Sequence, residues 1–208
     1  MRIDRLDVMH PGHATFVIVG EKTVYIDPYV LPASPKKADL ILITHPHYDH
    51  CDPGKVSLIR KADTVIVATA DCAKMLSGDV RAIKPGQTIK VGDIEVRAVP
   101  AYNVGKPFHP KANGWVGFIL KVGGTTLYHA GDTDFIPEMK EIKADIALLP
   151  IGGTYTMDVE QAVQAALAIK PRIVIPMHYN AIEGTEANPK EFKRKINEKN
   201  PNIKVEVL

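Results

Sequence analysis

The sequence predicts a single α/β domain over residues 1–208, in which two β-sheets are covered by helices on their outer faces. Short β-branched runs bounded by Gly, Pro or Asp recur along the chain, as strands do. Helical periodicity is clear in one segment and weaker in three others. The length of 208 residues fits one domain that can bury a full core.

The expected strands alternate with few helices. The strand-like runs are residues 14–19, 23–26, 40–43, 64–68, 94–99, 116–122, 125–128, 146–149 and 173–175. The clearest helix is 158–169, where an apolar stripe at helical spacing ends before Pro171. Weaker helices are expected at 53–60, 71–76 and 189–200.

Composition excludes several classes of protein. Hydrophobic residues make up 45% and charged residues 24%, which is typical of a globular chain. A net charge of +2 gives no electrostatic footprint for nucleic acid. No apolar run spans a bilayer, and the N-terminus carries charges where a signal peptide needs an apolar core. We therefore expect a cytoplasmic protein with a small-molecule substrate and without stable membrane association; its oligomeric state is left open.

Two cysteines, Cys51 and Cys72, are expected to be free thiols, since a chain without a signal peptide rarely forms disulfides. Neither has the CxxC spacing of a zinc ribbon. Cys51 directly follows the most informative segment of the chain, and a small core residue is its expected role.

That segment is LILITHPHYDH, residues 40–50, where an apolar strand leads into His45, His47, Asp49 and His50. Imidazole and carboxylate together are the ligand set of zinc, iron and manganese. In an extended loop, residues two apart point the same way, so His45, His47 and Asp49 are expected to converge while His50 points elsewhere. This pattern favours two metal ions over one.

Further ligand candidates follow two other strands. Asp132 comes directly after Gly131 in TTLYHAGDTD and is well placed to bridge metals, and His178 ends RIVIPMHY. Taken alone, a Gly-Asp turn or a terminal histidine is common in proteins without a metal. Three strand ends that close on His or Asp indicate one constellation, because α/β sheets gather their chemistry at the carboxyl ends of strands.

The run from His45 to His50 matches the HxHxDH motif, and the chain resembles the metallo-β-lactamase superfamily through HPGHATFVI, VYIDP, THPHYDH, HAGDTDF and PMHY. It is most similar to small, stand-alone, predicted metal-dependent hydrolases related to the L-ascorbate-6-phosphate lactonases. This resemblance implies a four-layer αββα sandwich with a binuclear site at one edge. It implies that His45 and His47 hold the first metal, that Asp49, His50 and His178 hold the second, and that Asp132 bridges them.

The chain departs from the family pattern at one ligand. Where the family has a third histidine for the first metal, this chain has Tyr102 and Asn103 in VPAYN. His109, six residues past Asn103, is a candidate if the loop folds back, and a substrate contact or a surface position is its alternative role. Asn103 itself or another residue is the alternative ligand. The remaining residues expected to line or support the site are His13, Asp27 and His129.

The chemistry implied is hydrolysis. Two divalent ions about 3.5 to 4 Å apart, zinc first and manganese or iron as alternatives, would provide a bridging hydroxide near neutral pH. Asp49 and Asp132 are the expected catalytic residues: the first orients the hydroxide and the second fixes the metal separation. Tyr48, Tyr102 and Lys106 are expected contacts to an oxyanion or a phosphate.

Three function classes follow. The first is hydrolysis of a small-molecule ester, lactone or phosphodiester. The second is phosphodiesterase action on a lipid headgroup, because the N-acylphosphatidylethanolamine phospholipase D group is similar in GHAT and HYDH. The third is a non-hydrolytic metal-binding protein or a di-iron redox protein. The chain has no GxSxG for a serine hydrolase and no glycine-rich phosphate loop.

Overall fold

The first half of the chain forms one sheet and the second half forms another. The computed structural model describes all residues from 1 to 208. The first sheet has the order β1 (Arg2–Ile3), β2 (Leu6–Gly12), β3 (Thr15–Val19), β4 (Thr23–Ile26), β5 (Leu40–Ile43), β6 (Val65–Ala68) and β7 (Asp79–Ala82). The second has the order β14 (Lys204–Val205), β13 (Ile173–Met177), β12 (Ile146–Pro150), β11 (Thr125–His129), β10 (Val116–Val122), β9 (Ile94–Pro100) and β8 (Thr88–Val91).

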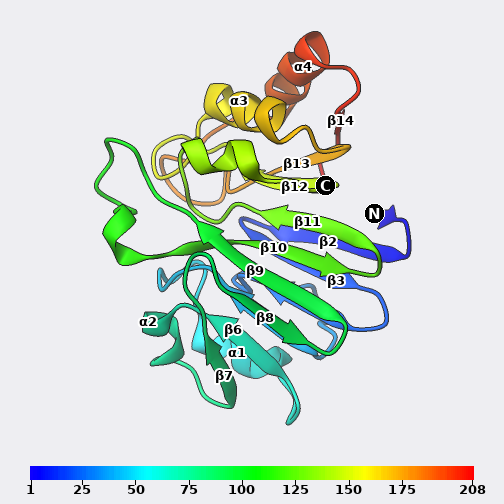
Figure 1. Cartoon of the computed structure of the whole chain (residues 1–208), viewed down its shortest axis with the longest axis vertical. Coiled ribbons are helices and arrows are strands. Elements are labelled where there is room, and N and C mark those ends of the chain that lie inside the picture. Colours follow the sequence, from blue (N-terminus) through cyan, green and yellow to red (C-terminus); the bar gives the residue numbers. More distant parts are fainter.

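Helices form the two outer layers. Figure 1 shows α3 (Val159–Ile169) and α4 (Pro189–Lys199) on one side of the sheets, with α1 (Pro53–Ile59) and α2 (Ala70–Ala73) on the opposite side. Two short 3-10 helices, η1 (Lys111–Asn113) and η2 (Pro137–Glu141), lie in loops. The predicted αββα sandwich is therefore confirmed. No helix combines the length and apolarity that a membrane crossing requires.

The central strands of the first sheet are buried on both faces. Phe16 and Ile18 of β3 belong to the main core between the sheets, whereas Val17 packs into a smaller core beneath α1 and α2. This follows from the two-residue period of a strand. It also explains the unbroken apolar run of β5, since a strand covered on both faces has no solvent side. Cys51 and Cys72 are free and buried in the smaller core.

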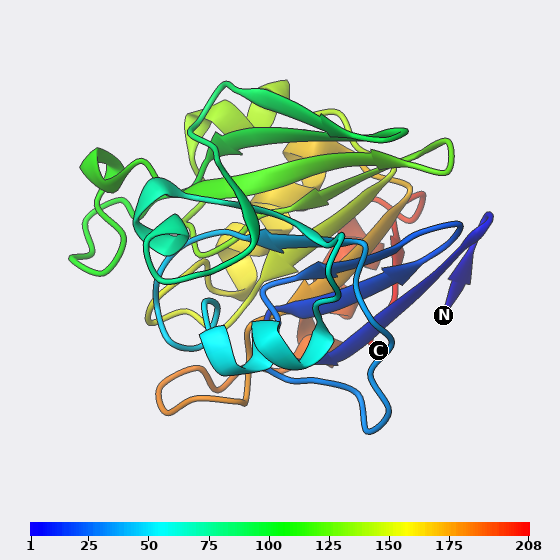
Figure 2. The ribbon, with the colours of Figure 1, turned by 90° about the horizontal axis from the view of Figure 1, so that it is seen from below.

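Parallel strands bring the predicted ligands to one edge. Strands β4 to β7 run parallel to one another, as do β11 to β14. The carboxyl ends of β5, β11 and β13 carry the segments with the HxHxDH motif, Asp132 and His178. Backbone hydrogen bonds join the sheets there, from the N–H of His178 to the carbonyl of His13 (2.8 Å) and from Val116 to Thr44 (3.3 Å). Figure 2, seen from the side of α1, shows the strands of the second half of the chain lying over those of the first half.

Several elements differ from the sequence prediction. Strands β1, β2, β7, β8 and β14 were not predicted, because they are very short, half-exposed or interrupted by polar residues and Pro11. The expected helix at 71–76 is only the short α2, which ends at Ala73. The long helix begins one residue later than expected because Asp158 is its N-cap, accepting a hydrogen bond from the N–H of Gln161 (2.8 Å).

Candidate metal centre

The ligand loop after β5 turns instead of extending. The N–H groups of His50 and Cys51 both donate to the carbonyl of His47, at 3.0 and 2.8 Å. Strand alternation therefore does not hold across this segment. The expected convergence of Asp49 with His45 and His47 is wrong: the Asp49 carboxylate lies beside His50, with 3.4 Å between Asp49 Oδ2 and His50 Nε2.

We call His45, His47 and His109 the first group, because their ring nitrogens all lie within 4.8 Å of one another. His45 Nε2 and His47 Nδ1 are 3.1 Å apart. His109 comes from the long loop between β9 and β10, which folds back as expected. Asn103 holds it there: its Oδ1 accepts from the His109 N–H (3.1 Å) and lies 3.2 Å from Nδ1. The Nε2 atom of His109 is left to face the site.

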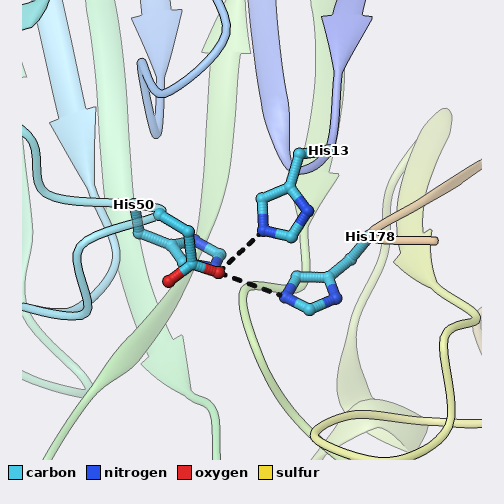
Figure 3. A group of neighbouring side chains, drawn as sticks. His13, His50 and His178 are labelled. Carbon is cyan, nitrogen blue, oxygen red and sulfur yellow. Dashed lines mark hydrogen bonds and ion pairs between the residues drawn. The ribbon is translucent and has the colours of Figure 1, made fainter. Parts of the chain in front are cut away.

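The second group is His13, Asp49, His50 and His178, whose ligand atoms also lie within 4.8 Å of one another. Figure 3 shows the rings of His13, His50 and His178 converging from three separate segments. His13 Nε2 is 2.8 Å from Asp49 Oδ2, and His178 Nε2 is 3.8 Å from the same oxygen. His13 is therefore more central than the sequence suggested, since it contacts a predicted ligand directly.

Asp132 lies between the two groups. Its Oδ2 is 3.0 Å from His178 Nε2 and 3.4 Å from His109 Nε2, and its Oδ1 is 3.3 Å from His50 Nε2. Gly131 makes this position possible: its φ is +65°, and a Cβ there would lie 2.8 Å from the carbonyl oxygen of Val116. The placement is the one that a bridging carboxylate needs.

Asp27 and Thr44 form hydrogen bonds to one histidine of each group. Asp27 Oδ2 accepts from His50 Nδ1 (2.8 Å) and from the Thr44 hydroxyl (2.7 Å). Because that hydroxyl gives its only proton to Asp27, its oxygen accepts from Nδ1 of His45 (2.9 Å). Both imidazoles are thereby oriented with Nε2 toward the centre, as metal-bound histidines commonly are. Sequence reasoning missed Thr44, although it directly precedes the motif.

His129 supports the site without entering it. Its ring is buried, its Nε2 donates to the carbonyl of Ala14 (2.9 Å), and its Nδ1 accepts from the N–H of Gly131 (3.2 Å). Ala14 neighbours His13, and Gly131 neighbours Asp132. The ring thus ties the backbone on the two sides of the centre together, in keeping with a supporting position.

Two expected substrate contacts are corrected by the structure. The Tyr102 hydroxyl donates to the carboxylate of Glu138 (2.9 Å). Lys106 Nζ donates to Asp134 Oδ1 (2.7 Å) and to two backbone carbonyls (2.8 and 2.6 Å). Neither side chain lines the cavity above the centre. Tyr48 does line this cavity.

Buried atoms without hydrogen-bond partners test whether these residues fit metal ions. They include Nε2 of His50, His109 and His178 and Oδ1 of Asp132. Buried polar atoms in proteins are nearly always paired, so four that face one small volume indicate a binding partner of another kind. Imidazole nitrogens and carboxylate oxygens are the donors that zinc, iron and manganese take, and the donor set therefore fits divalent ions.

Burial and charge set the protonation of the groups. Burial lowers the pKa of His109 to about 4 and that of His45 well below its usual value. Burial also opposes charge on His50, but the carboxylates of Asp132 and Asp27 raise its pKa well above 6.5. Burial disfavours ionised Asp132 too, yet His178 and His50 hold the pKa of this carboxyl well below its usual range. His45 and His109 are thus neutral at pH 7, as a ligand must be.

A cavity of about 260 Å³ opens above the centre. Its floor is formed by residues of both groups, namely His47, Asp49, His109, Asp132 and His178. Its rim is formed by Tyr48, Phe108, Tyr155 and Ile182. A small molecule in this cavity reaches the ligand atoms directly.

The fold and this His/Asp centre define a class of protein, and comparisons agree. Residues 7–178 match the Beta-lactamase superfamily domain. A UPF0173 metal-dependent hydrolase of Thermoplasma acidophilum is 40% identical over 92% of this chain and 91% of its own length. One of Pyrococcus furiosus is 38% identical, over 90% and 91%. The solved structure of Igni18, a novel metallo hydrolase from Ignicoccus hospitalis, has a TM-score of 0.82 and 30% identity, covering 98% of this chain and 94% of that one.

The chain therefore belongs to the beta-lactamase superfamily and, within it, to the family of UPF0173 metal-dependent hydrolases. The expected resemblance is confirmed at both levels.

Proposed function

We propose that this metal-dependent hydrolase holds two divalent ions and cleaves a small-molecule ester, lactone or phosphodiester. The observation that carries the proposal is the position of Asp132, whose two oxygens lie within 3.4 Å of His50, His109 and His178. One carboxylate that lies between the unpartnered Nε2 of His109 on one side and those of His50 and His178 on the other is the arrangement that a shared ligand of two ions requires.

Each group would hold one ion. In the first group, His45, His47 and His109 supply three nitrogens, and Asp132 adds an oxygen. The second ion would be held by Asp49, His50 and His178, together with the shared Asp132. Zinc is the first choice for this mixture of nitrogen and oxygen donors, with manganese and iron as alternatives.

Bound divalent ions of this kind supply hydroxide at neutral pH and polarise the substrate oxygen at the bond to be broken. The residues of the chain provide the geometry. Asp49 lines the cavity floor, where its carboxylate would accept a hydrogen bond from the attacking group and orient it toward the substrate. His13, 2.8 Å from Asp49 Oδ2, keeps that carboxylate in place. The Asp27 and Thr44 network keeps the imidazoles in place.

Metal content and hydrolysis measured on the same samples test the proposal. Protein purified without chelators or a histidine tag is analysed by elemental mass spectrometry and assayed with aryl esters, lactones and bis(p-nitrophenyl) phosphate. We expect about two ions per chain and activity that is lost with chelator and restored by metal. Asp132→Asn should lose metal and activity, whereas Asp63→Asn, at an exposed carboxylate, should lose neither. Full activity of metal-free protein contradicts the proposal.

A further inference from the structure

We infer that the part of the substrate that extends away from the metals is apolar and uncharged; this rests on the proposed function and narrows its substrate class. The reacting ester, lactone or phosphodiester group would lie on the cavity floor, and the remaining part against the rim. A substrate with a second phosphate or carboxylate far from the reacting bond is disfavoured.

The rim is made of apolar and aromatic side chains. Tyr48 is 65% exposed and Phe108 is 39% exposed, and both line the same cavity, so they belong to one contiguous patch of the kind that marks binding sites. Phe108 packs edge-to-face against Tyr155, with ring centroids 4.8 Å apart. Ile182 completes the rim. Rings held in this way offer a firm apolar surface at little cost in conformational entropy.

The cavity offers no cation for a distant anionic group. No lysine or arginine lines it. Lys106 is in the loop that carries Phe108, but all three of its N–H donors are taken, by Asp134 and by two backbone carbonyls. Recognition of a phosphate ordinarily uses such a lysine, an arginine fork or a helix N-terminus. An anionic tail would leave water without gaining any of these partners.

The size of the cavity agrees with a small substrate. A volume of about 260 Å³ is just below the range of about 300 to 1,000 Å³ that is typical of sites for drug-sized ligands. Such a space takes one ring or a short chain beyond the reacting group.

Binding of matched hydroxamic acids tests this inference separately from catalysis. Benzohydroxamic, butyrohydroxamic and succinic monohydroxamic acids carry the same metal-binding group, and they differ in the part that would meet the rim. On metal-loaded protein, we expect the first two to bind at least about tenfold more tightly than the succinic compound, measured by calorimetry. Tenfold corresponds to about 1.4 kcal/mol, less than the full burial of an aromatic side chain.

Substitutions at the rim test which side chains cause the preference for apolar compounds. Phe108→Ala and Tyr155→Ala should bring the ratio of affinities for the apolar and succinic compounds close to one without changing metal content. Phe108→Leu should keep most of this affinity ratio. Leu58→Ala, at an exposed leucine on α1, is the matched control and should change nothing. Equal or tighter binding of the succinic compound overturns the inference.

Turnover separates failure of the inference from failure of the proposed function. p-Nitrophenyl butyrate and p-nitrophenyl hemisuccinate form the corresponding pair of substrates. Hydrolysis of both at similar kcat/KM overturns the inference and leaves the hydrolase standing. Absence of any turnover, in protein that binds two ions and retains the apolar preference, overturns the proposed reaction and leaves the rim as a binding surface. Absence of all hydroxamate binding in loaded protein contradicts both.

Discussion

The two halves of the proposed centre are built differently. The second group is fully buried, joins segments of both sheets, and contains a carboxylate of its own, Asp49, that His13 holds. The first group has three imidazoles and no carboxylate except the shared Asp132. Its His47 is only partly buried, and its His109 depends on the long loop between β9 and β10. The difference suggests that metal affinity is unequal.

Two causes favour the second group. An anionic ligand strengthens attraction to a dication in a buried place, where charges are weakly screened. Strand ends and the turn between β2 and β3 position its ligands, whereas a loop with exposed residues opens more readily. We therefore expect the second ion to bind tightly and the first to exchange.

Loss of Asp132 should weaken metal binding by both groups, because both share it. In Asp132→Asn, the side chain keeps its shape but loses its charge. We expect affinity for both ions to fall by more than the roughly 10- to 100-fold typical of residues that act on a metal indirectly. Metal titration monitored by fluorescence of Trp115, the only tryptophan, measures this, because its ring centroid lies 5.2 Å from that of His45. Retention of both ions at wild-type affinity contradicts the bridge.

Loss of one terminal ligand from each group should separate the two ions. His109→Gln should leave about one ion per chain, retained by the second group. His178→Gln should be the more damaging change, because the first ion also loses the neighbour that completes its bridge. Elemental analysis after gel filtration compares the two variants. If His109→Gln keeps two ions, the assignment of His109 is wrong.

Residues that hold ligands should give smaller, group-specific effects. Asp27→Asn removes the charged partner of His50, and Asn103→Ala removes the acceptor that orients His109. We expect affinity losses of about 10- to 100-fold. The loss in Asp27→Asn should be larger in the second group, because Asp27 contacts His50 directly and reaches His45 only through Thr44. The loss in Asn103→Ala should fall on the first group. Competition with a chelator of known affinity quantifies them. Thermal unfolding of the metal-free variants shows whether the fold itself has changed.

The smallest expected difference between the two groups is in the protons that their ligands release on metal binding. Without metal, the pKa of His50 is raised well above 6.5, so its imidazole carries a proton at pH 7 that a metal ion must displace. The lowered pKa values of His45 and His109 leave no proton to release there. Affinity of the second group should therefore rise with pH up to the pKa of His50. Calorimetry in two buffers with different ionisation enthalpies should show release of this imidazole proton with the tight ion, beyond any proton that bound water loses.

The sequence predicted the parts of the fold that have one strong signal. The apolar run of β5 is a strand because both of its faces are buried, and the stripe of α3 is a helix because only one face is. The peripheral strands β7 and β8 lack that signal, since their residues are half-exposed and polar. Their pairing comes from neighbouring strands, which no local pattern records.

The residues of the candidate site also divide into those that a local sequence pattern predicts and those that it does not. The HxHxDH motif, Asp132 and His178 were found because each ends a strand. The position of Asp49 was predicted wrongly because the segment forms a turn and not an extended loop. The turn is closed by hydrogen bonds to the His47 carbonyl, which the pattern of alternating residues does not predict. The engagement of Lys106 with Asp134 depends on contacts 28 residues apart in sequence, which spacing alone does not reveal. Thr44 was missed for the same reason, because its role depends on its hydrogen bonds to Asp27 and His45.

Stepwise metal removal tests the central claim of two unequal groups most directly. Protein loaded with zinc is dialysed against chelators of increasing affinity, and zinc per chain is measured by elemental mass spectrometry at each step. We expect the zinc content to fall from two ions to a plateau at one, and we expect this plateau to be absent in His178→Gln. Saturation at a single ion, or loss of both ions in one step, contradicts it.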